Sequence, residues 1–404
     1  MMPRQQVLII LEYCANSIKR AAWKIRRGNR FTLFLNLRKG FFYFLLFIEQ
    51  GMSLMKYGFW LPIFGGWLRN VEDEKMPPTF DYAKKVIQSA EDWGYDTTLI
   101  AELYLNDIKG TEADSIEAWS TAAALAAVTN KIEIMTAVRP VYHNPAVTAK
   151  MAANIDHISN GRFTLNVVSG WWAEEAKQYG GAFTEHDERY ERTEEFLEIL
   201  KGLWTEETFS YDGKFYQIEN TKLSPKPVQR PNPILYAGGE SEKGKQVITS
   251  HCDAYVLHGH TVEEAEVKIA DMKERRKAAG REPLQSIGMA AYVVCRDTEE
   301  EALEEVKRIT TVGDLSGYAG FKDFTSMSEL EQQVKLQDYS VSNRGLRPNL
   351  VGTPEQIAKQ IIEFEKVGVD LLLLQCSPQL EELERFSKQV MPKVEELRAE
   401  LTNI

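Results

Sequence analysis

From Lys56 onward, short runs of apolar, β-branched and aromatic residues alternate with longer stretches in which apolar residues recur every three or four positions. The short runs predict buried strands, and the longer stretches predict amphipathic helices. The expected strands are 57–63, 96–101, 132–138, 163–168, 233–237, 254–258, 288–295 and 369–375. The clearest helical stretches between them are 82–93, 116–128, 146–158, 192–204, 262–278 and 354–367.

This alternation of strand and helix is typical of α/β proteins with a parallel sheet. Eight strand-helix units predict a closed (β/α)8 barrel, the TIM barrel. An open, doubly wound sheet is the alternative, but no G-x-G-x-x-G turn follows the first strand. Residues 310–350 follow the seventh strand and its helix with weaker periodicity, and we expect an insertion there, either a lid or a surface excursion.

The first 54 residues differ from the rest, with a basic stretch followed by an aromatic run at 40–48. Arg38 and Lys39 interrupt this segment, which disfavours a transmembrane helix, and a signal peptidase site is not apparent. We favour an N-terminal extension outside the domain, produced by a start codon assigned too early, with Met52 or Met55 as the true start. Residues 55–404 would then form a single barrel domain.

The charge is uneven along the 404 residues. The net charge is -11, but residues 1–54 carry nine Lys/Arg and two Asp/Glu, or +7, so the remainder carries -18. An acidic body lacks the clustered cations that bind nucleic acid. The four cysteines lie far apart, and neither they nor the six histidines show metal-ligand spacing. We therefore expect a cytoplasmic protein with no metal, nucleic-acid partner or membrane association.

Two strand ends carry candidate chemistry. The fourth strand ends in Asn166, Ser169, Gly170 and a tryptophan pair, at the face where barrel enzymes keep their active sites. After the fifth strand, residues 238–241 read Gly-Gly-Glu-Ser and lead into a helix, which is typical of a phosphate site. Each pattern is also compatible with an ordinary tight turn.

Charges near these turns add further alternatives. Glu240 would repel a phosphate unless it points away or pairs with a cation such as Lys243. Arg189 and Tyr190, close to the start of a long amphipathic helix, either reach an anionic ligand or belong to a solvated helix face.

Six motifs occur in order between Lys56 and about Leu397. They are VRP (138–140), AANIDHISNGR (152–162), NVVSGW (166–171), EHDERYERTEEF (185–196), YAGGES (236–241) and NLVGT (349–353). With these motifs the chain resembles the bacterial luciferase-like flavin monooxygenases, in the branch that contains alkanesulfonate, dimethyl sulfone and pyrimidine ring-opening monooxygenases.

The resemblance implies a site for reduced FMN. The residues that match it are Asn166, Ser169, Glu175, Arg189, Tyr190, Gly239 and Ser241. Glu102 and Leu103 match a flavin-contacting pair in position but not in residue type. The resemblance also implies O2 as co-substrate, a separate NAD(P)H-dependent flavin reductase and a homodimer or homotetramer.

Candidate hydrogen-bond donors to the reacting groups are His258, Tyr292, Arg139, Arg344 and Arg347. Alkanesulfonate enzymes of this branch have a cysteine and a basic-plus-histidine pair where this chain has Ser115, Ala290 and Tyr292. Losing a cation favours a neutral substrate such as a dialkyl sulfone or an alkane, because a sulfonate needs charge-assisted hydrogen bonds. Arg139, Arg344 and Arg347 are cations that can bind a sulfonate, so a sulfonate stays an alternative substrate.

The sequence therefore predicts an FMNH2-dependent monooxygenase that oxidises a small organosulfur compound. A long-chain alkane monooxygenase is the main alternative, and a deazaflavin-dependent oxidoreductase is a second. A sugar-phosphate isomerase or hydrolase would use the same barrel but needs acid/base pairs at the strand ends. Only Glu102 and His258 offer such groups. A non-catalytic binding protein is the least favoured alternative.

Overall fold

Eight parallel strands close into a barrel, as the sequence predicts. They are β1 (Lys56–Trp60), β2 (Thr97–Ile100), β3 (Glu133–Val138), β4 (Phe163–Val167), β7 (Leu235–Ala237), β8 (Ala254–Leu257), β9 (Ile287–Cys295) and β11 (Leu371–Gln375). Each pairs in parallel with its neighbours, and the β9 pairings with β8 and β11 close the ring. The TIM barrel is confirmed.

The computed structural model describes residues 54–313, 318, 321–327, 334–341 and 345–401. Residues 54–395 form one compact unit. The expected N-terminal extension, except for its last residue, and the candidate donor Arg344 lie outside the described residues.

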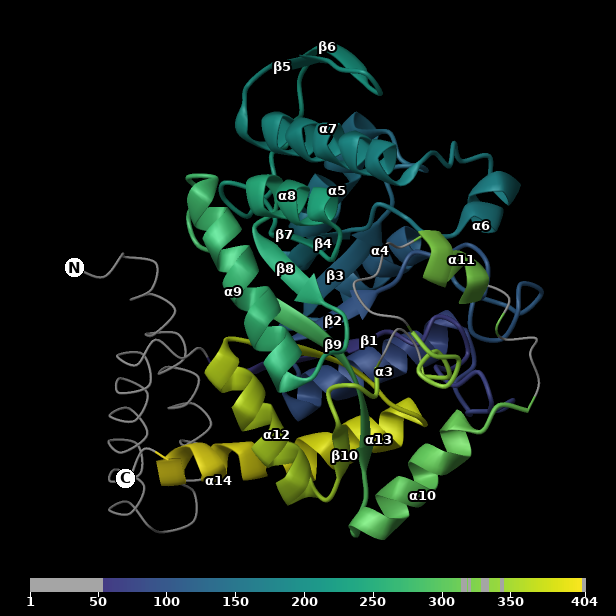
Figure 1. The fold of residues 1–404 in the computed structure, drawn as a ribbon. Coiled ribbons are helices and arrows are strands. Elements are labelled where there is room, and N and C mark those ends of the chain that lie inside the picture. Colours follow the sequence, from purple (N-terminus) through teal and green to yellow (C-terminus); the bar gives the residue numbers. More distant parts are fainter. Residues whose placement is uncertain (1–53, 314–317, 319–320, 328–333, 342–344, 402–404) are drawn as a thin grey trace. The chain divides into compact units, whose positions relative to one another are not determined.

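Helices follow the strands and surround the barrel (Figure 1). The principal ones are α3 (Phe80–Trp93), α4 (Ala118–Val128), α5 (Pro145–Ser159), α7 (His186–Thr205), α8 (Glu242–His251), α9 (Val262–Ala278), α10 (Glu299–Thr310) and α12 (Pro354–Val367). Shorter or terminal segments are α6 (Ala173–Gln178), α11 (Phe321–Met327), α13 (Gln379–Arg385), the π-helical η3 (Phe386–Val390) and α14 (Met391–Leu401). Thr261, Thr298 and Thr353 form capping boxes at the starts of α9, α10 and α12, which satisfies backbone groups left free at a helix N-terminus.

The barrel interior is filled by inward-facing side chains of alternate strand residues. One cluster joins five strands: Leu99, Met135, Tyr236, Ala254, Val256, Leu371 and Leu373. Because this layer is packed, a ligand cannot enter from below, and open space is left at the carboxyl ends of the strands.

Three strands were not expected. β5 (Phe209–Asp212) and β6 (Gln217–Thr221) form an antiparallel hairpin next to α7, seen at the top of Figure 1. Tyr211 Oη on this hairpin donates to Glu198 on α7 at 2.7 Å. The short strand β10 (Leu350–Gly352) pairs with the end of β9, beyond the closed barrel.

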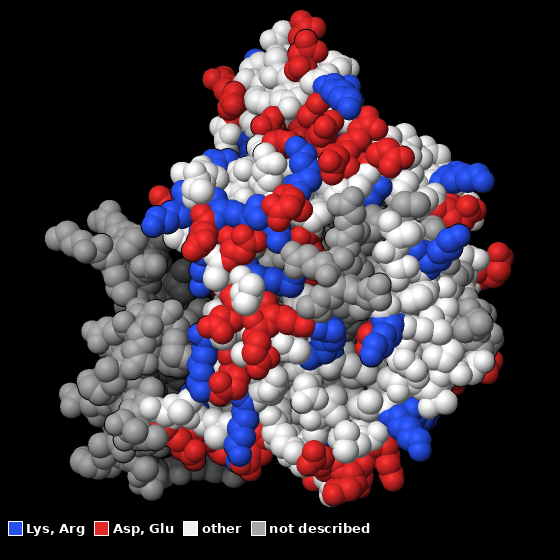
Figure 2. Space-filling view, viewed as in Figure 1, with Lys and Arg blue, Asp and Glu red and all other residues white. Residues whose placement is uncertain are grey.

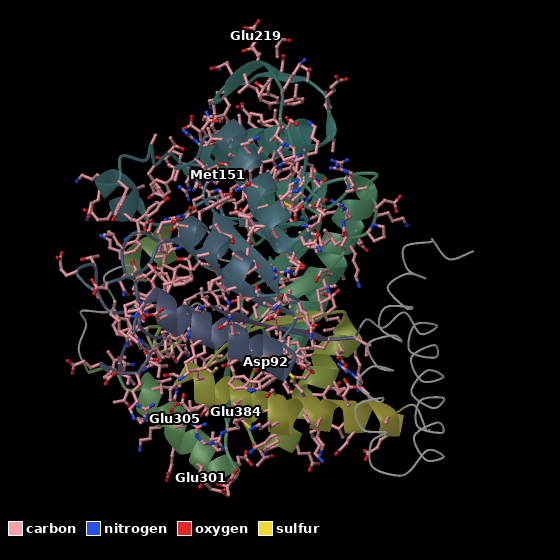
Figure 3. The ribbon with its side chains drawn as sticks, turned by 180° about the vertical axis from the view of Figure 1, so that it is seen from behind. Asp92, Met151, Glu219, Glu301, Glu305 and Glu384 are labelled. Carbon is pink, nitrogen blue, oxygen red and sulfur yellow. The ribbon has the colours of Figure 1, made fainter. Side chains whose placement is uncertain are left out.

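Charged side chains are concentrated on the outer elements. On the face shown in Figure 2, described acidic and basic side chains are interspersed, and no continuous basic patch appears among them. Seen from behind, Asp92 on α3, Glu301 and Glu305 on α10 and Glu384 on α13 lie outside the strands (Figure 3). Within the described ranges, no helix has both the length and the apolar character needed to cross a membrane.

Candidate active site

A cavity opens at the carboxyl ends of the barrel strands. Its lining includes Ala101, Arg139, Asn166, Gly238, His258 and Gln375, at the ends of six strands, and Ala290 within β9. Aromatic side chains complete it, from the end of β1 (Trp60), from loops (Phe64, Trp67 and Trp171) and from α11 (Phe324). The position is the one that TIM-barrel enzymes use for catalysis.

One end of the cavity is suited to an anion. Arg189 and Tyr190 reach it from α7, and Gly239 reaches it from the turn before α8. Arg189 is 6% exposed, and its Nη1 donates to the Thr184 carbonyl at 2.8 Å. A Cβ at Gly239 would lie 2.8 Å from Tyr190 Oη, so only glycine leaves this approach open.

Ser241, expected at the phosphate turn, is the N-cap of the helix that follows this turn. Its Oγ accepts from Gly244 N–H at 3.1 Å as the N-cap of α8, and it is not among the lining residues. Ser241 thus starts the helix whose N-terminus faces the anion end.

The sequence suggested that Lys243 neutralises Glu240, but other residues lie beside the Glu240 carboxylate. The Glu240 carboxylate lies 3.0 Å from His260 Nε2 and 3.9 Å from Lys268 Nζ. Lys243 instead pairs with Glu194 at 3.7 Å. The Glu240 carboxylate therefore faces His260 and Lys268 on the β8–α9 side.

Asn166 and Ser169 line the cavity after β4. Asn166 is 8% exposed, and its Oδ1 has no hydrogen-bond partner among the described residues. Buried acceptors are normally satisfied, so this atom indicates a ligand with a donor group. Ser169 Oγ shares a hydrogen bond of 2.9 Å with Thr193 Oγ1 on α7, which joins the two elements.

Arg139 belongs to a buried ion-pair network. Its guanidinium contacts Glu175 through Nη1 and lies 3.7 Å from Glu102 through Nε, and its backbone N–H donates to Glu102 Oε2 at 2.7 Å. Burial opposes the charge, but Glu175 and Glu102 outweigh it and raise the pKa of Arg139. His143 Nε2 lies 2.6 Å from Glu102 Oε1.

Glu175 is fully enclosed and does not line the cavity, whereas Glu102 and Arg139 do. Backbone N–H groups of Tyr104 and Leu105 donate to Glu175 Oε1 at 2.6 and 3.2 Å. Glu175 therefore fixes a loop and Arg139 from behind the cavity wall.

Some of the candidate hydrogen-bond donors line the cavity and others do not. Arg139 and His258 line the cavity. Tyr292 is 1% exposed, is not a lining residue, and has a pKa raised well above its ordinary value by burial. Arg347 contacts Glu264 on α9. The structure therefore does not bring Tyr292 and Arg347 to the cavity.

A second ion pair in the cavity wall was missed at the sequence level. Arg69 Nη2 lies 2.6 Å from Asp107 Oδ2, and Arg69 Nε donates to the Tyr339 carbonyl at 2.8 Å. Tyr339 Oη donates to both carboxylate oxygens of Asp107 at 3.1 Å, and its ring lies 3.9 Å from the guanidinium carbon. Nothing in the local sequence joins these three residues, since the pair spans two loops and Tyr339 lies 232 positions from Asp107.

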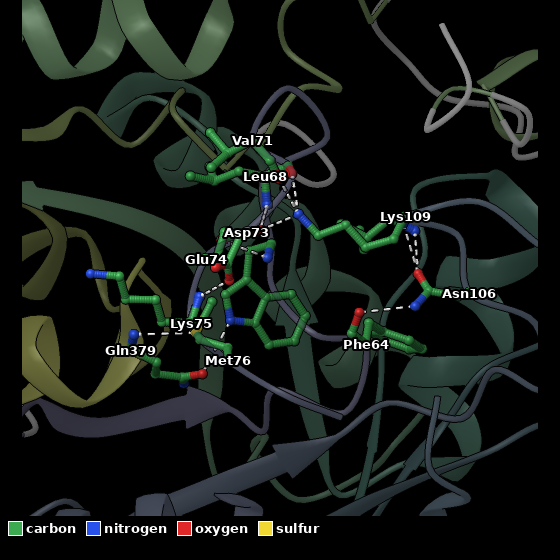
Figure 4. Close-up of polar contacts among 12 residues, drawn as sticks. Phe64, Leu68, Val71, Asp73, Glu74, Lys75, Met76, Asn106, Lys109 and Gln379 are labelled. Atoms are coloured by element: carbon green, nitrogen blue, oxygen red, sulfur yellow. Dashed lines mark hydrogen bonds and ion pairs between the residues drawn. The ribbon is translucent and has the colours of Figure 1, made fainter. Parts of the chain in front are cut away.

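The loop after β1 is held by buried charges (Figure 4). Glu74 accepts from the backbone N–H groups of Trp67 and Leu68 at 3.1 and 2.9 Å, and Lys109 Nζ donates to its Oε1 at 2.6 Å. Trp67 Nε1 donates to Gln379 at 3.2 Å. These contacts fix Trp67 as part of the cavity wall.

Part of the 310–350 segment packs on the cavity. Tyr318, Phe324, Val334 and Tyr339 form one cluster, and Trp171 packs against it. Phe324 lines the cavity and meets Trp171 edge-on at 5.6 Å between ring centroids. Among the described residues, no group of three or more His, Cys, Asp or Glu side chains is placed to hold a metal ion.

A barrel with this cavity defines an α/β-barrel enzyme that accepts an anionic, partly flat ligand. Comparison narrows the class, because the model of the luciferase-like monooxygenase family matches residues 55–371. The chain belongs to the luciferase-like monooxygenase family and is an enzyme of that type.

Two relatives are FMNH(2)-dependent dimethylsulfone monooxygenases. The protein from Pseudomonas putida is 35% identical over 356 residues, covering 86% of this chain and 97% of its own length. That from Pseudomonas fluorescens (strain Pf0-1) is 34% identical over 359 residues, covering 87% and 97%. The solved structure of a long-chain alkane monooxygenase (LadA) has a TM-score of 0.71 at 19% identity, covering 85% of this chain and 92% of that one, and supports the fold.

Proposed function

We propose that this protein is a reduced-FMN-dependent monooxygenase that oxidises a small, neutral organosulfur compound of the dialkyl sulfone type. The proposal is supported by the two dimethylsulfone monooxygenase relatives and by a cavity whose two ends differ in chemistry. One end offers a cation, a hydroxyl and a helix start. The other is aromatic.

The residues present fit FMN. Arg189, Tyr190 and the N-terminus of α8 would hold its phosphate, because cations and free backbone N–H groups at a helix start bind anions. Asn166 would accept from the ring system with its unpaired Oδ1. When bound, reduced FMN supplies the electrons that activate O2.

The protein's own contribution is positioning and exclusion of water. Phe324 and Trp171 cover the cavity, and the Arg69–Asp107 pair holds Tyr339 above it. A dry, preorganised site strengthens hydrogen bonds to the reacting groups and protects them from side reactions. Arg139 and His258, which line the cavity, would be the donors to the reacting groups.

The proposal of a neutral substrate rests on the ion pairs that the arginines of the cavity wall form with carboxylates. Arg69 is paired with Asp107, and Arg139 with Glu102 and Glu175. A sulfonate would add a further buried anion beside cations whose charge is already balanced by these carboxylates, which is costly in a site of low polarity. A sulfone has no net charge to neutralise.

We further propose that a separate NAD(P)H-dependent reductase supplies the reduced flavin, that the chain assembles as a homodimer or homotetramer, and that residues 55–404 form the catalytic domain. We propose a cytoplasmic location. The described part of the 310–350 segment around Phe324 and Tyr339 is proposed to cover the active site.

The test is aerobic turnover with enzymatically reduced FMN and a panel of dimethyl sulfone, methanesulfonate, longer alkanesulfonates and alkanes. We expect kcat/KM to be highest for the sulfone. A preference for long alkanes would favour the alkane monooxygenase alternative. Activity with reduced deazaflavin and none with reduced FMN would overturn the proposal.

A further inference from the structure

Gln375, the last residue of β11, lines the cavity and is only 2% exposed. Its side-chain amide therefore belongs to the cavity wall. A polar group in the wall of a cavity can offer its donors and its acceptor to a ligand that enters the cavity.

The direction of this side chain follows from the strand. Leu371 and Leu373 belong to the cluster inside the barrel. Side chains two residues apart on a strand share a face, so Gln375 lies above Leu373 at the top of the interior, where the cavity begins.

The neighbouring strands leave space beside it. Phe59 of β1 is paired with Leu374, so Trp60, the next residue, lies beside Gln375. On the other side, Ala290 of β9 is paired with Leu373, one layer below. Trp60 and Ala290 both line the cavity, and the methyl group of Ala290 leaves the volume next to the amide unfilled.

This part of the wall presents an uncharged polar group among aromatic rings. Trp60 and Trp67 pack edge-on, with ring centroids 6.3 Å apart, and Phe64 packs on Trp67. A primary amide has two N–H donors and one acceptor. It can therefore meet a neutral oxygen acceptor without the desolvation cost of a buried cation.

We propose that Gln375 is a specificity-determining residue that donates its Nε2–H to an oxygen of a neutral sulfone and, because it is uncharged, does not supply the charge-assisted hydrogen bond that a buried sulfonate needs. The substrate is held between this amide and the rings of Trp60 and Trp67. The inference rests on the proposed function, because it assigns the group that recognises the sulfone oxygen.

The test compares Gln375→Leu with the wild-type enzyme, using full-length protein and reduced FMN. We expect kcat/KM for dimethyl sulfone to fall about tenfold, mainly through KM, since a single neutral hydrogen bond is lost. The inhibition constant of diethyl sulfide, which has no oxygen acceptor, and the Kd for reduced FMN should stay within about twofold. Gln88→Leu on α3, whose amide donates to the Val128 carbonyl outside the cavity, is the matched control.

A second variant tests selection directly. Ala290→Arg places a cation beside the amide and should raise the ratio of kcat/KM for methanesulfonate to that for dimethyl sulfone at least tenfold. An unchanged ratio would count against the inference.

The outcomes separate the two proposals. If the wild-type enzyme oxidises dimethyl sulfone and Gln375→Leu oxidises it equally well, the role of Gln375 is overturned and the proposed function is not. Equal losses in sulfone turnover and sulfide inhibition would also overturn the role of Gln375, since they indicate a general packing defect. Failure of the wild-type enzyme to oxidise any sulfone overturns the proposed function.

Discussion

At the scale of single residues, the structure distinguishes groups that line the cavity from groups that hold others in place behind its wall. Arg189, Asn166 and Gln375 line the cavity, whereas Glu175 and Ser241 act through Arg139 and α8. The sequence motifs contain residues of both groups, because a motif gives the position of a residue in the chain and not the direction of its side chain.

Replacing Arg189 with Ala should raise the Kd for reduced FMN by about tenfold to a hundredfold, because a charge-assisted contact contributes about 1.5–3 kcal/mol. Arg192→Ala is the control, since Arg192 stacks on Phe215 at 4.7 Å, on the same helix but outside the cavity. Fluorescence titration with anaerobically reduced FMN gives both constants. Equal constants for the two variants would contradict the assignment of the phosphate end.

Gly239→Ala tests the close approach at the same end. The added methyl group would lie 2.8 Å from Tyr190 Oη, so the hydroxyl must move away from the turn. We expect the Kd for FMN to rise more than fivefold and the Kd for riboflavin, which lacks the phosphate, to change less. A similar change for both would place the effect elsewhere in the flavin site.

At the scale of elements, the sequence predicted the eight barrel strands well because each is a short apolar run between polar turns. Seven of the observed barrel strands are shorter than expected by one or two residues, and β9 is one residue longer. The β5–β6 hairpin was missed because its residues alternate between exposed and half-buried positions, without an apolar run. Strand β10, at three residues, is too short for a periodic pattern.

The segment after α10 shows a further limit of sequence reasoning. Its weak periodicity indicated only an insertion. Its cluster around Tyr318, Phe324 and Tyr339 depends on contacts with Arg69, Asp107 and Trp171. Those contacts join loops that follow three different barrel strands, so no local pattern could reveal them.

Tyr339→Phe should loosen this cover. The variant removes the hydroxyl that donates to Asp107 and leaves a buried carboxylate with one donor fewer, at a cost of about 1–3 kcal/mol. We expect faster amide hydrogen exchange at residues 334–341 and a higher KM. Tyr211→Phe, on the distant β5–β6 hairpin, should leave both unchanged. Unaltered exchange at 334–341 in Tyr339→Phe would contradict the proposed contact.

At the scale of the whole molecule, buried charge at the amino end of the barrel affects stability. Burial raises the pKa of Glu133 above its ordinary value of 4.5, and hydrogen bonds from Thr164 and Thr97 oppose this only in part. The folded protein then binds this proton more tightly than the unfolded chain. Its contribution to stability is complete below about pH 4.5 and is lost as the pH rises through the folded-state value.

Glu133→Gln should therefore raise the free energy of unfolding at pH 8 by about 1 kcal/mol, the ordinary size of a single-site effect, and change it less at pH 5. Urea denaturation at the two pH values measures this. Glu219→Gln, on the exposed hairpin strand β6, is the control and should have no effect (Figure 3). Destabilisation by Glu133→Gln at pH 8 would show that the carboxylate is stabilising.

The proposed domain limits predict that a protein starting at Met55 keeps its activity. The family model begins at residue 55, and residues 54–395 form one compact unit. We expect kcat/KM within about twofold of the full chain. A large loss would show that residues 1–54 take part in folding or catalysis.

The central claim is that the cavity uses reduced FMN and O2 to oxidise a neutral organosulfur compound. The most direct measurement is the reaction of full-length protein, reduced FMN and dimethyl sulfone under ¹⁸O2, with mass spectrometry of the products. The account predicts one ¹⁸O atom in an organic product for each sulfone consumed, and little product with Arg189→Ala at limiting FMN. Products without ¹⁸O, or no consumption of sulfone, would contradict it.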